Sequence, residues 1–157
     1  MSASPEKQLS SNTSAGRLDE QLCFALYAAT NAITRRYRPL LSSIGLTYPQ
    51  FLVLLILWEK DDCSIGSIAE RLGLASHAVS PIIDRLEHLD LVLKGRDQND
   101  GRVSLIRLTP SGRSLEASAA EVQDAIRCTT HLVDDEIHDL RSRLHALAAE
   151  YRDTAAK

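Results

Sequence analysis

Apolar residues recur along this chain at the spacing of amphipathic helices, with one interruption by two short strand-like runs. The spacing predicts a helix over residues 18–37, which Pro39 is expected to end because proline has no amide proton. Residues 48–59 are apolar on nearly every face, so we expect a helix at the centre of the core. Two further helices are predicted over about 113–131 and 134–151. The chain is therefore expected to be mostly α-helical.

A helix-turn-helix followed by a β-hairpin is predicted in the middle of the chain. The first helix is expected to end at Gly73, where a left-handed residue is favoured, and the second to begin with Ser76 as its N-cap. Apolar runs at 91–93 and 103–108 enclose a polar loop that ends in Asn-Asp-Gly, which is typical of a hairpin turn. A winged helix has these parts in this order, and its second helix and hairpin contact DNA. Two packed helices and an ordinary hairpin are the simpler alternative.

The charge balance suits a selective DNA-binding protein better than one that coats nucleic acid. The 157 residues carry a formal net charge of −3. From Arg85 to Arg113, however, there are six Lys or Arg residues and four Asp or Glu residues, which gives this segment a net charge of +2. A modest basic patch on an acidic chain of single-domain length is expected of a protein that reads a particular site.

The sequence predicts neither secretion nor a bound metal or cofactor. Residues 1–16 are rich in serine and are expected to form a disordered tail before a single domain at 17–157. The longest apolar run, residues 51–58, is too short to span a bilayer. Three cysteines, Cys23, Cys63 and Cys128, share no metal-ligand spacing and are odd in number. We therefore expect a cytoplasmic protein with free thiols.

The last predicted helix carries a narrow apolar seam of coiled-coil type. Its members alternate at spacings of three and four residues: Ile137, Leu140, Leu144, Leu147 and Tyr151. We expect a homodimer whose interface is formed by helices at about 18–37 and 113–151, with a winged helix-turn-helix at about 48–112. The alternative is that the seam packs onto its own domain. A dimer would place two recognition helices on half-sites about one DNA turn apart, in a pseudo-palindromic operator.

Several motifs resemble those of the MarR family of bacterial transcriptional regulators. The resemblance rests on the order of the elements, on Asp-Gly-Arg at 100–102 and on Leu-Thr-Pro-Ser-Gly at 108–112, and it extends from about Leu18 to the end. The blocks at 22–27, 37–41 and 45–50 resemble, in particular, the OhrR group of organic hydroperoxide sensors.

The recognition helix departs from the OhrR pattern at two places. It begins Ser-His-Ala-Val-Ser-Pro at 76–81, whereas that group usually has Ser-Gly-Thr-Leu-Thr-Pro. Asp84 stands where the group has a basic residue, and an acid near phosphates is expected to lower the affinity for DNA. These differences leave the operator sequence open.

The resemblance implies a peroxide-sensing thiol at Cys23. In the OhrR group, tyrosines matching Tyr37 and Tyr48 donate hydrogen bonds to this thiol, and Tyr27 follows Cys23 by one helical turn on the same face. Phenolic donors favour the thiolate and so lower the pKa of the thiol. Cys128 matches the resolving cysteine of the two-cysteine members, in which the disulfide partner comes from the other subunit. The ordinary alternative is a buried Cys23 and tyrosines that serve core packing.

The same layout indicates which residues meet DNA. They fall into three groups: Ser76, His77 and Ser80 facing the major groove, Arg85 and Arg96 near phosphates, and Arg102, oriented by Asp100, in the minor groove.

These observations favour a repressor that releases its operator when an organic hydroperoxide oxidises Cys23. One alternative is a repressor of the same family that a noncovalent phenolic or apolar ligand releases. Another is a thiol peroxidase that uses Cys23 and Cys128, although no thioredoxin-like pattern or Cys-x-x-Cys is present. We therefore expect a protein that is not an enzyme.

Overall fold

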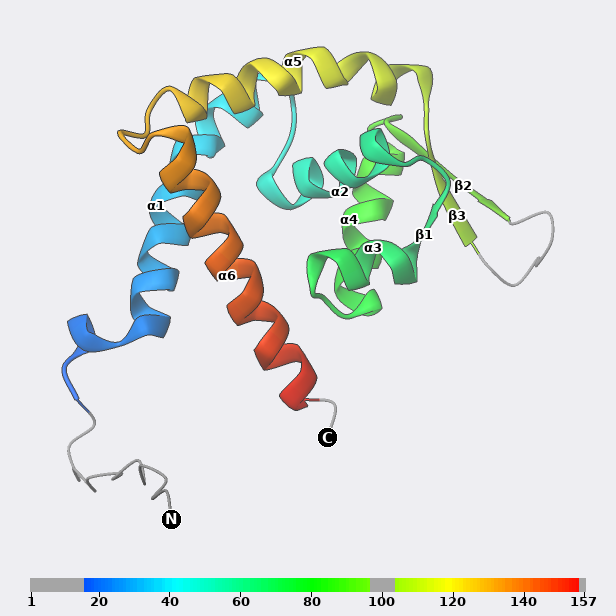
Figure 1. Ribbon diagram of the computed structural model, residues 1–157. Helices are drawn as coiled ribbons and strands as arrows, with labels where there is room; N and C mark the ends of the chain where they lie inside the picture. Colours follow the sequence, from blue (N-terminus) through cyan, green and yellow to red (C-terminus); the bar gives the residue numbers. More distant parts are fainter. Residues whose placement is uncertain (1–15, 97–103, 156–157) are drawn as a thin grey trace.

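The computed structural model describes residues 16–96 and 104–155. The helices are a 3-10 turn at Leu18–Glu20, α1 at Leu22–Ser43, α2 at Tyr48–Glu59, α3 at Ile65–Leu72, α4 at Ser76–His88, α5 at Pro110–Arg127 and α6 at Asp134–Ala155. The strands are β1 at Cys63–Ser64, β2 at Val92–Arg96 and β3 at Ser104–Leu108 (Figure 1). The expected fold class, mostly helical with a small wing, is confirmed. The tail predicted at 1–16 lies, except for its last residue, outside the described residues.

The strands form one antiparallel sheet in the order β1-β3-β2. Strands β2 and β3 make the predicted hairpin, with Val92 opposite Leu108 and Arg96 opposite Ser104. Strand β1 was not predicted, because two residues are too few to show the alternation of a strand. Its Cys63 pairs with Ile106 of β3, and Ser64 pairs with Leu105.

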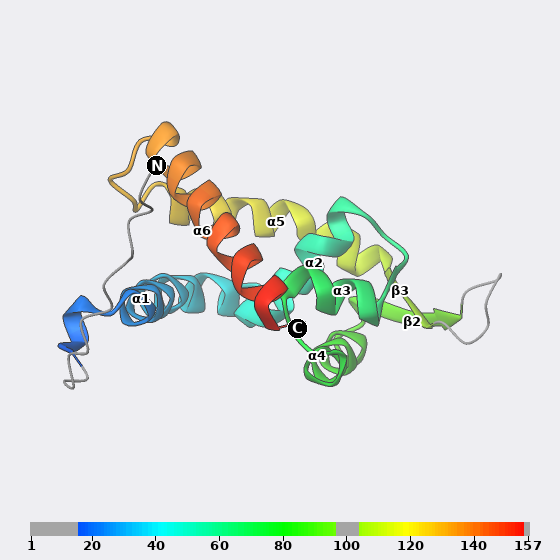
Figure 2. The same ribbon diagram turned by 60° about the horizontal axis from the view of Figure 1, so that its bottom comes forward.

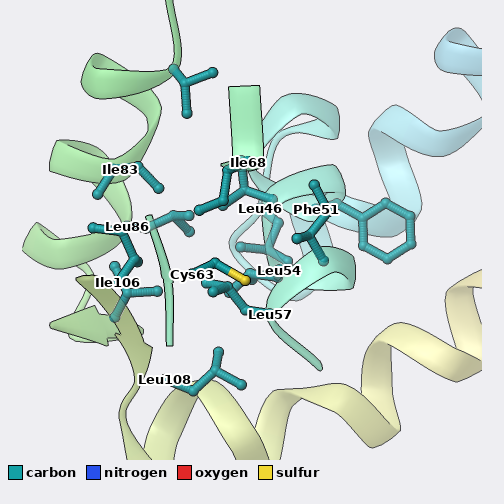
Figure 3. Packing of buried hydrophobic residues seen from close by; sticks show 14 of the residues in the cluster. Leu46, Phe51, Leu54, Leu57, Cys63, Ile68, Ile83, Leu86, Ile106 and Leu108 are labelled. Atoms are coloured by element: carbon teal, nitrogen blue, oxygen red, sulfur yellow. The ribbon is translucent and has the colours of Figure 1, made fainter. Parts of the chain in front are cut away.

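Helix α2 lies at the centre of the hydrophobic core, as its apolar composition predicted. Phe51, Val53, Leu54 and Leu57 are each at most 1% exposed. Figure 3 shows side chains of α3, α4 and the sheet packed around this helix, among them Ile68, Ile83, Leu86 and Ile106. These four, together with Val79 and Val92, are fully buried. The core therefore belongs to the part of the chain that holds α4 and the wing.

Helix α1 does not end at Pro39, and that prediction was wrong. The helix continues to Ser43, although Pro39 lies inside it and cannot donate a helical hydrogen bond. Leu41, which follows the proline, is fully buried in the core, and its burial offsets the missing bond. The helix ends at Ser43, and the chain turns away at Gly45, whose φ of 76° lets Leu46 N–H donate to the Leu41 carbonyl at 2.9 Å.

Two helix starts also differ from the predictions. Helix α4 has Ala75 as its N-cap, so Ser76 is its first residue and not its cap. Helix α5 begins at Pro110, three residues before the predicted start, because Thr109 caps it by accepting a hydrogen bond from Gly112 N–H at 2.9 Å. Proline suits the first position of a helix, where its missing amide proton is not needed.

Helices α1 and α6 extend away from the core, and α5 connects this end of the molecule with the sheet (Figures 1 and 2). No residue of α6 whose burial is described is buried. The seam residues Leu140, Leu144 and Tyr151 are 47%, 38% and 68% exposed. The seam therefore does not pack onto its own domain, which was the alternative to a dimer interface.

Among the described residues, no single helix is both long and apolar enough to cross a membrane. Helices α1 and α2 meet such a test only when taken together across a bend of 76°.

Gly112 is the point of closest approach between α5 and the turn that connects α4 with β2. Leu91 in that turn accepts a hydrogen bond from Thr109 N–H at 3.1 Å. The Trp58 indole N–H of α2 donates to the Gly112 carbonyl at 3.0 Å. A methyl group on Gly112 would place its carbon 2.0 Å from the Leu91 carbonyl oxygen. Only glycine therefore fits at this junction.

We expect Gly112→Ala to lower the free energy of unfolding by about 3 kcal/mol, because the backbone must shift to relieve the overlap. Gly66→Ala in α3 is the matched control, since its new methyl would make only an ordinary contact, 3.8 Å from Ser64 Oγ. Alanine is preferred in helices, so this control is expected to raise the stability by up to about 1 kcal/mol. Thermal unfolding followed by circular dichroism measures both effects, and equal melting temperatures would contradict the prediction.

Candidate nucleic-acid interface and thiol site

Helix α4 presents its polar residues outward because its apolar residues are held in the core. Val79, Ile83 and Leu86 are fully buried. On the other side Ser76, His77 and Arg85 are exposed, while Ser80 is half-buried. The Ser80 hydroxyl donates to the Ser76 carbonyl at 3.0 Å, and its oxygen remains able to accept a hydrogen bond from a ligand. All four side chains predicted to meet DNA from this helix are thus accessible, with Ser76, His77 and Ser80 on neighbouring positions of the helix surface and Arg85 further round it.

The wing extends this face beyond α4. Arg96 is exposed at the end of β2, opposite Ser104 of β3. Asp100 and Arg102, predicted for the minor groove, lie outside the described residues and stay predictions.

Asp84 has a role in the structure that the sequence did not reveal. It forms an ion pair with Lys94 of β2, and Glu87 lies 3.3 Å from the same Lys94 ammonium group. The acid at position 84 is therefore compensated by a lysine ten residues away. The pairing arises because the wing strand β2 lies against α4. The expected effect of Asp84 on the affinity for DNA stays a prediction.

Two other basic residues of the predicted patch are also paired with acids. Arg107 of β3 forms an ion pair with Asp62, and Arg113 of α5 forms one with Asp61. Asp61 additionally accepts a hydrogen bond from Leu108 N–H at 3.0 Å. These pairs fix the loop before β1 onto β3 and α5, and no local pattern links residues so far apart in sequence. The basic patch is consequently narrower than the six residues counted along the chain.

Cys23 lies near the start of α1 and is exposed. Apolar residues along the same helix are also accessible: Leu22 is 58% exposed and Ile33 is 51% exposed, and we call these residues the α1 stripe. Tyr27 is 66% exposed. The ordinary alternative of a small buried cysteine therefore does not hold in the single chain. That alternative does hold for Cys63, which is 8% exposed, lies among Leu54, Leu57 and Ile106 (Figure 3) and donates from Sγ to the Lys60 carbonyl at 3.0 Å.

Tyr37 and Tyr48 form an aromatic cluster with Phe51 at the other end of α1. The ring centroids of the two tyrosines are 5.1 Å apart, and Tyr37 lies 5.7 Å from Phe51. Burial raises the pKa of both phenols above the ordinary value of 10.0, and the neighbouring Tyr48 raises that of Tyr37 further. Both groups therefore keep their protons near neutral pH and can donate hydrogen bonds.

One chain does not bring the predicted sensing residues together. Tyr37 follows Cys23 by fourteen residues in the same helix, which separates them by about 21 Å along its axis. Cys128 is exposed at the C-terminal end of α5. Its neighbours in sequence, Arg127 and Thr129, line a groove together with residues 32–37 of α1, far from the end that carries Cys23. Any contact of Cys23 with Tyr37 or Cys128 therefore requires a second chain.

That groove has a volume of about 1070 Å³ and lies between α1, the end of α5 and α6. Its apolar lining includes Ile33, Ile126, Ile137, Leu140 and Leu144. Residues of the α6 seam and Ile33 of the α1 stripe thus line the same groove. Among the described residues, no group of three or more His, Cys, Asp or Glu side chains could hold a metal ion.

Known proteins share this arrangement of helices and wing. The sequence model of the MarR family matches residues 46–104. The organic hydroperoxide resistance transcriptional regulator of Bacillus subtilis is 35% identical over 131 residues, covering 83% of this chain and 89% of that protein. The regulator TtmR of Methylorubrum extorquens is 40% identical, covering 97% of this chain and 83% of its own.

The structure of reduced AbfR bound to DNA aligns with a TM-score of 0.75 at 30% identity, covering 88% of this chain and 94% of that one. AbfR comes from Staphylococcus epidermidis, and its disulfide form aligns with a TM-score of 0.60 at 30% identity, covering 90% and 94%. These relatives are DNA-binding regulators and not enzymes. The chain belongs to the MarR family of transcriptional regulators.

Proposed function

We propose that this regulator is a homodimeric repressor that senses organic hydroperoxides through Cys23 and then releases its operator. The observation that carries the proposal is the exposed Cys23 thiol near apolar residues of α1 that no described part of the chain buries. An exposed thiol is open to oxidation, and the apolar surroundings suit organic hydroperoxides better than hydrogen peroxide. The identity of 35% with an organic hydroperoxide resistance regulator supports the same signal.

A second copy of the chain is the partner proposed for the α1 stripe and the α6 seam. Both are apolar, both remain accessible in one chain, and both border the groove of about 1070 Å³. A dimer related by a two-fold axis would bury them against their equivalents. It would also bring Cys23 of one chain toward the other end of the partner's α1.

The dimer would complete the sensing site. Tyr37 and Tyr48 of the partner subunit would donate hydrogen bonds to the Cys23 thiolate, since burial keeps both phenols protonated. Tyr27, one turn from Cys23, would cover the thiol from its own helix. These contacts would favour the thiolate, which is the nucleophilic form.

The proposed reaction has two steps. The Cys23 thiolate attacks the terminal oxygen of the hydroperoxide, the O–O bond breaks, and the alkoxide leaves and takes up a proton as an alcohol. Cys23 becomes a sulfenic acid. The thiolate of Cys128 from the partner subunit then attacks the Cys23 sulfur, a disulfide forms, and hydroxide leaves and is protonated to water.

The disulfide would move the helices that hold the DNA-binding elements. A disulfide requires the two Cα atoms to lie within about 7 Å. Because Cys128 ends α5, and α5 is fixed at its other end to the α4–β2 turn, displacement of Cys128 would be transmitted to α4.

In the reduced dimer, α4 would enter the major groove. Ser76, His77 and Ser80 would approach base edges, and Arg85 and Arg96 would lie near phosphates. Arg102, oriented by Asp100, is assigned to the minor groove on the sequence alone. The operator would then be a pseudo-palindrome with half-sites about one DNA turn apart.

The central prediction concerns release from DNA. We expect cumene hydroperoxide to lower the affinity of the wild-type chain for its own promoter DNA by more than about tenfold, and to have no such effect on Cys23→Ser. The matched control is Cys63→Ala, which is expected to respond like the wild type because this thiol is buried in the core. Fluorescence anisotropy with labelled promoter DNA measures the affinities.

Nonreducing electrophoresis tests the second step, since an intersubunit disulfide is expected for the wild type and Cys63→Ala but not for Cys128→Ser. If Cys23→Ser were released as readily as the wild type, thiol sensing would be wrong and a noncovalent ligand would be favoured. Sustained consumption of hydroperoxide without sequence-selective DNA binding would instead indicate a thiol peroxidase.

A second prediction concerns the dimer. Leu144→Asp places a charge in the α6 seam, so we expect a monomer whose affinity for promoter DNA is lower by roughly a hundredfold, since one subunit then binds one half-site. Ser142→Asp adds the same charge on the opposite face of α6 and is expected to leave the dimer intact. Analytical ultracentrifugation distinguishes the two, and a dimeric Leu144→Asp would contradict the proposed interface.

A third prediction concerns the buried phenols. In a spectrophotometric titration of the reduced protein, Tyr48→Phe is expected to lower the pKa of Tyr37, because the charge of the Tyr48 phenolate no longer opposes ionisation of Tyr37. The pKa of Tyr37 should nevertheless stay above 10.0, because burial is the larger cause of its shift. Ionisation of Tyr37 at or below this value in the variant would show that burial does not control the phenol.

A further inference from the structure

Three charged side chains connect the recognition helix with the wing. Asp84 and Glu87 lie in α4, one turn apart, and Lys94 lies at the middle of β2, opposite Ile106 of β3. The Lys94 ammonium group forms an ion pair with Asp84 and lies 3.3 Å from a Glu87 carboxylate oxygen. The Lys94 backbone N–H also donates to the other Glu87 carboxylate oxygen at 3.2 Å. Both the side chain and the main chain of β2 are thereby held by α4.

The contacts of Lys94 with α4 also fix the position of Arg96 relative to the recognition helix. Arg96 follows Lys94 by two residues in β2, so both side chains lie on the same face of the strand. Any rotation of β2 relative to α4 would therefore move Arg96 relative to the exposed residues of α4. The only direct polar contacts between α4 and β2 among the described residues are those of Lys94 with Asp84 and Glu87.

The charge of Lys94 is already balanced within the protein. Two carboxylates surround one ammonium group, and the hydrogen bond with Asp84 raises the pKa of Lys94 above its ordinary value. Lys94 therefore stays protonated, and moving it to a phosphate would leave Asp84 and Glu87 uncompensated next to DNA. Arg85 and Arg96, by contrast, form no ion pair with another described residue.

We propose that Lys94 is a positioning residue that fixes the wing against the recognition helix through Asp84 and Glu87, and does not itself contact a DNA phosphate. This inference rests on the proposed binding of DNA by α4 and the wing. It assigns to Asp84 a structural partner on β2 in place of a contact with DNA. It also explains how the chain accommodates an acid on the exposed side of its recognition helix.

The salt dependence of DNA binding distinguishes positioning from a phosphate contact. Each phosphate contact that is lost reduces the slope of log K against log salt concentration by about 0.9. We expect Lys94→Gln to weaken binding to promoter DNA by about fivefold, the scale of an exposed ion pair, and to leave this slope unchanged. Arg96→Gln, the same type of change two residues along the strand, is the matched control and should reduce the slope.

Two further variants test the contact itself. Lys94→Arg keeps a cation that can reach both carboxylates and is expected to restore the wild-type affinity. In the double variant Asp84→Asn with Lys94→Gln, the two changes disrupt the same contact, so their effects on affinity are expected to be less than additive. Circular dichroism establishes that each variant is folded, so a change in affinity reflects the wing and not unfolding.

Two results would overturn the inference. One is a slope that falls in Lys94→Gln as much as in Arg96→Gln, which would make Lys94 a phosphate contact. The other is an unchanged affinity in Lys94→Gln, which would remove any role in DNA binding. If the wild-type chain itself failed to bind its promoter DNA selectively, the proposed function would fail instead, so the two failures are distinguishable.

Discussion

The close approach of Gly112 to the carbonyl of Leu91 is the constraint on which the arrangement of this molecule depends. At this point the start of α5 contacts the α4–β2 turn, and Thr109 donates to Leu91 at 3.1 Å. The Thr109 hydroxyl also donates to the Asp90 carbonyl at 2.6 Å, while Trp58 of α2 holds Gly112 from the core side. Helix α2, the α4–β2 turn and the long helix α5 are therefore joined by one set of contacts, each of which involves a backbone carbonyl. Because backbone atoms cannot repack as side chains do, the direction of α5 is coupled to that of α4.

Ion pairs within the protein decide which basic residues near α4 and the wing remain available to contact DNA. Lys94, Arg107 and Arg113 each have an acidic partner that belongs to another element. Exposed ion pairs add little to the free energy of unfolding, so their effect is mainly geometric. They hold the wing strand to the recognition helix and the loop before β1 to the sheet. A net charge counted along the sequence thus overstates the charge that this surface can offer to DNA.

The three cysteines differ in how exposed their thiols are. Cys63 lies in the core, where a small thiol packs like an apolar side chain, whereas Cys23 near the start of α1 and Cys128 at the end of α5 are exposed. Tyr37 lies about 21 Å along α1 from Cys23, and Tyr48 of α2 lies next to Tyr37. A redox site of this kind is incomplete in one chain, so sensing and dimer formation would depend on the same helix faces.

The sequence by itself determined the helices, their apolar faces and the wing, because the periodicity of buried residues is a local property. It also located the turn at Gly73, where a φ of 65° favours glycine. It failed at Pro39, where burial of Leu41 decides whether the helix continues, and at β1, which exists only because Cys63 pairs with Ile106. Only the tertiary structure decided that Asp84 is paired, that Cys23 is exposed and that Cys23 lies apart from Tyr37 and Tyr48. These properties depend on distances between segments remote in sequence, and such distances are set by packing of the whole chain.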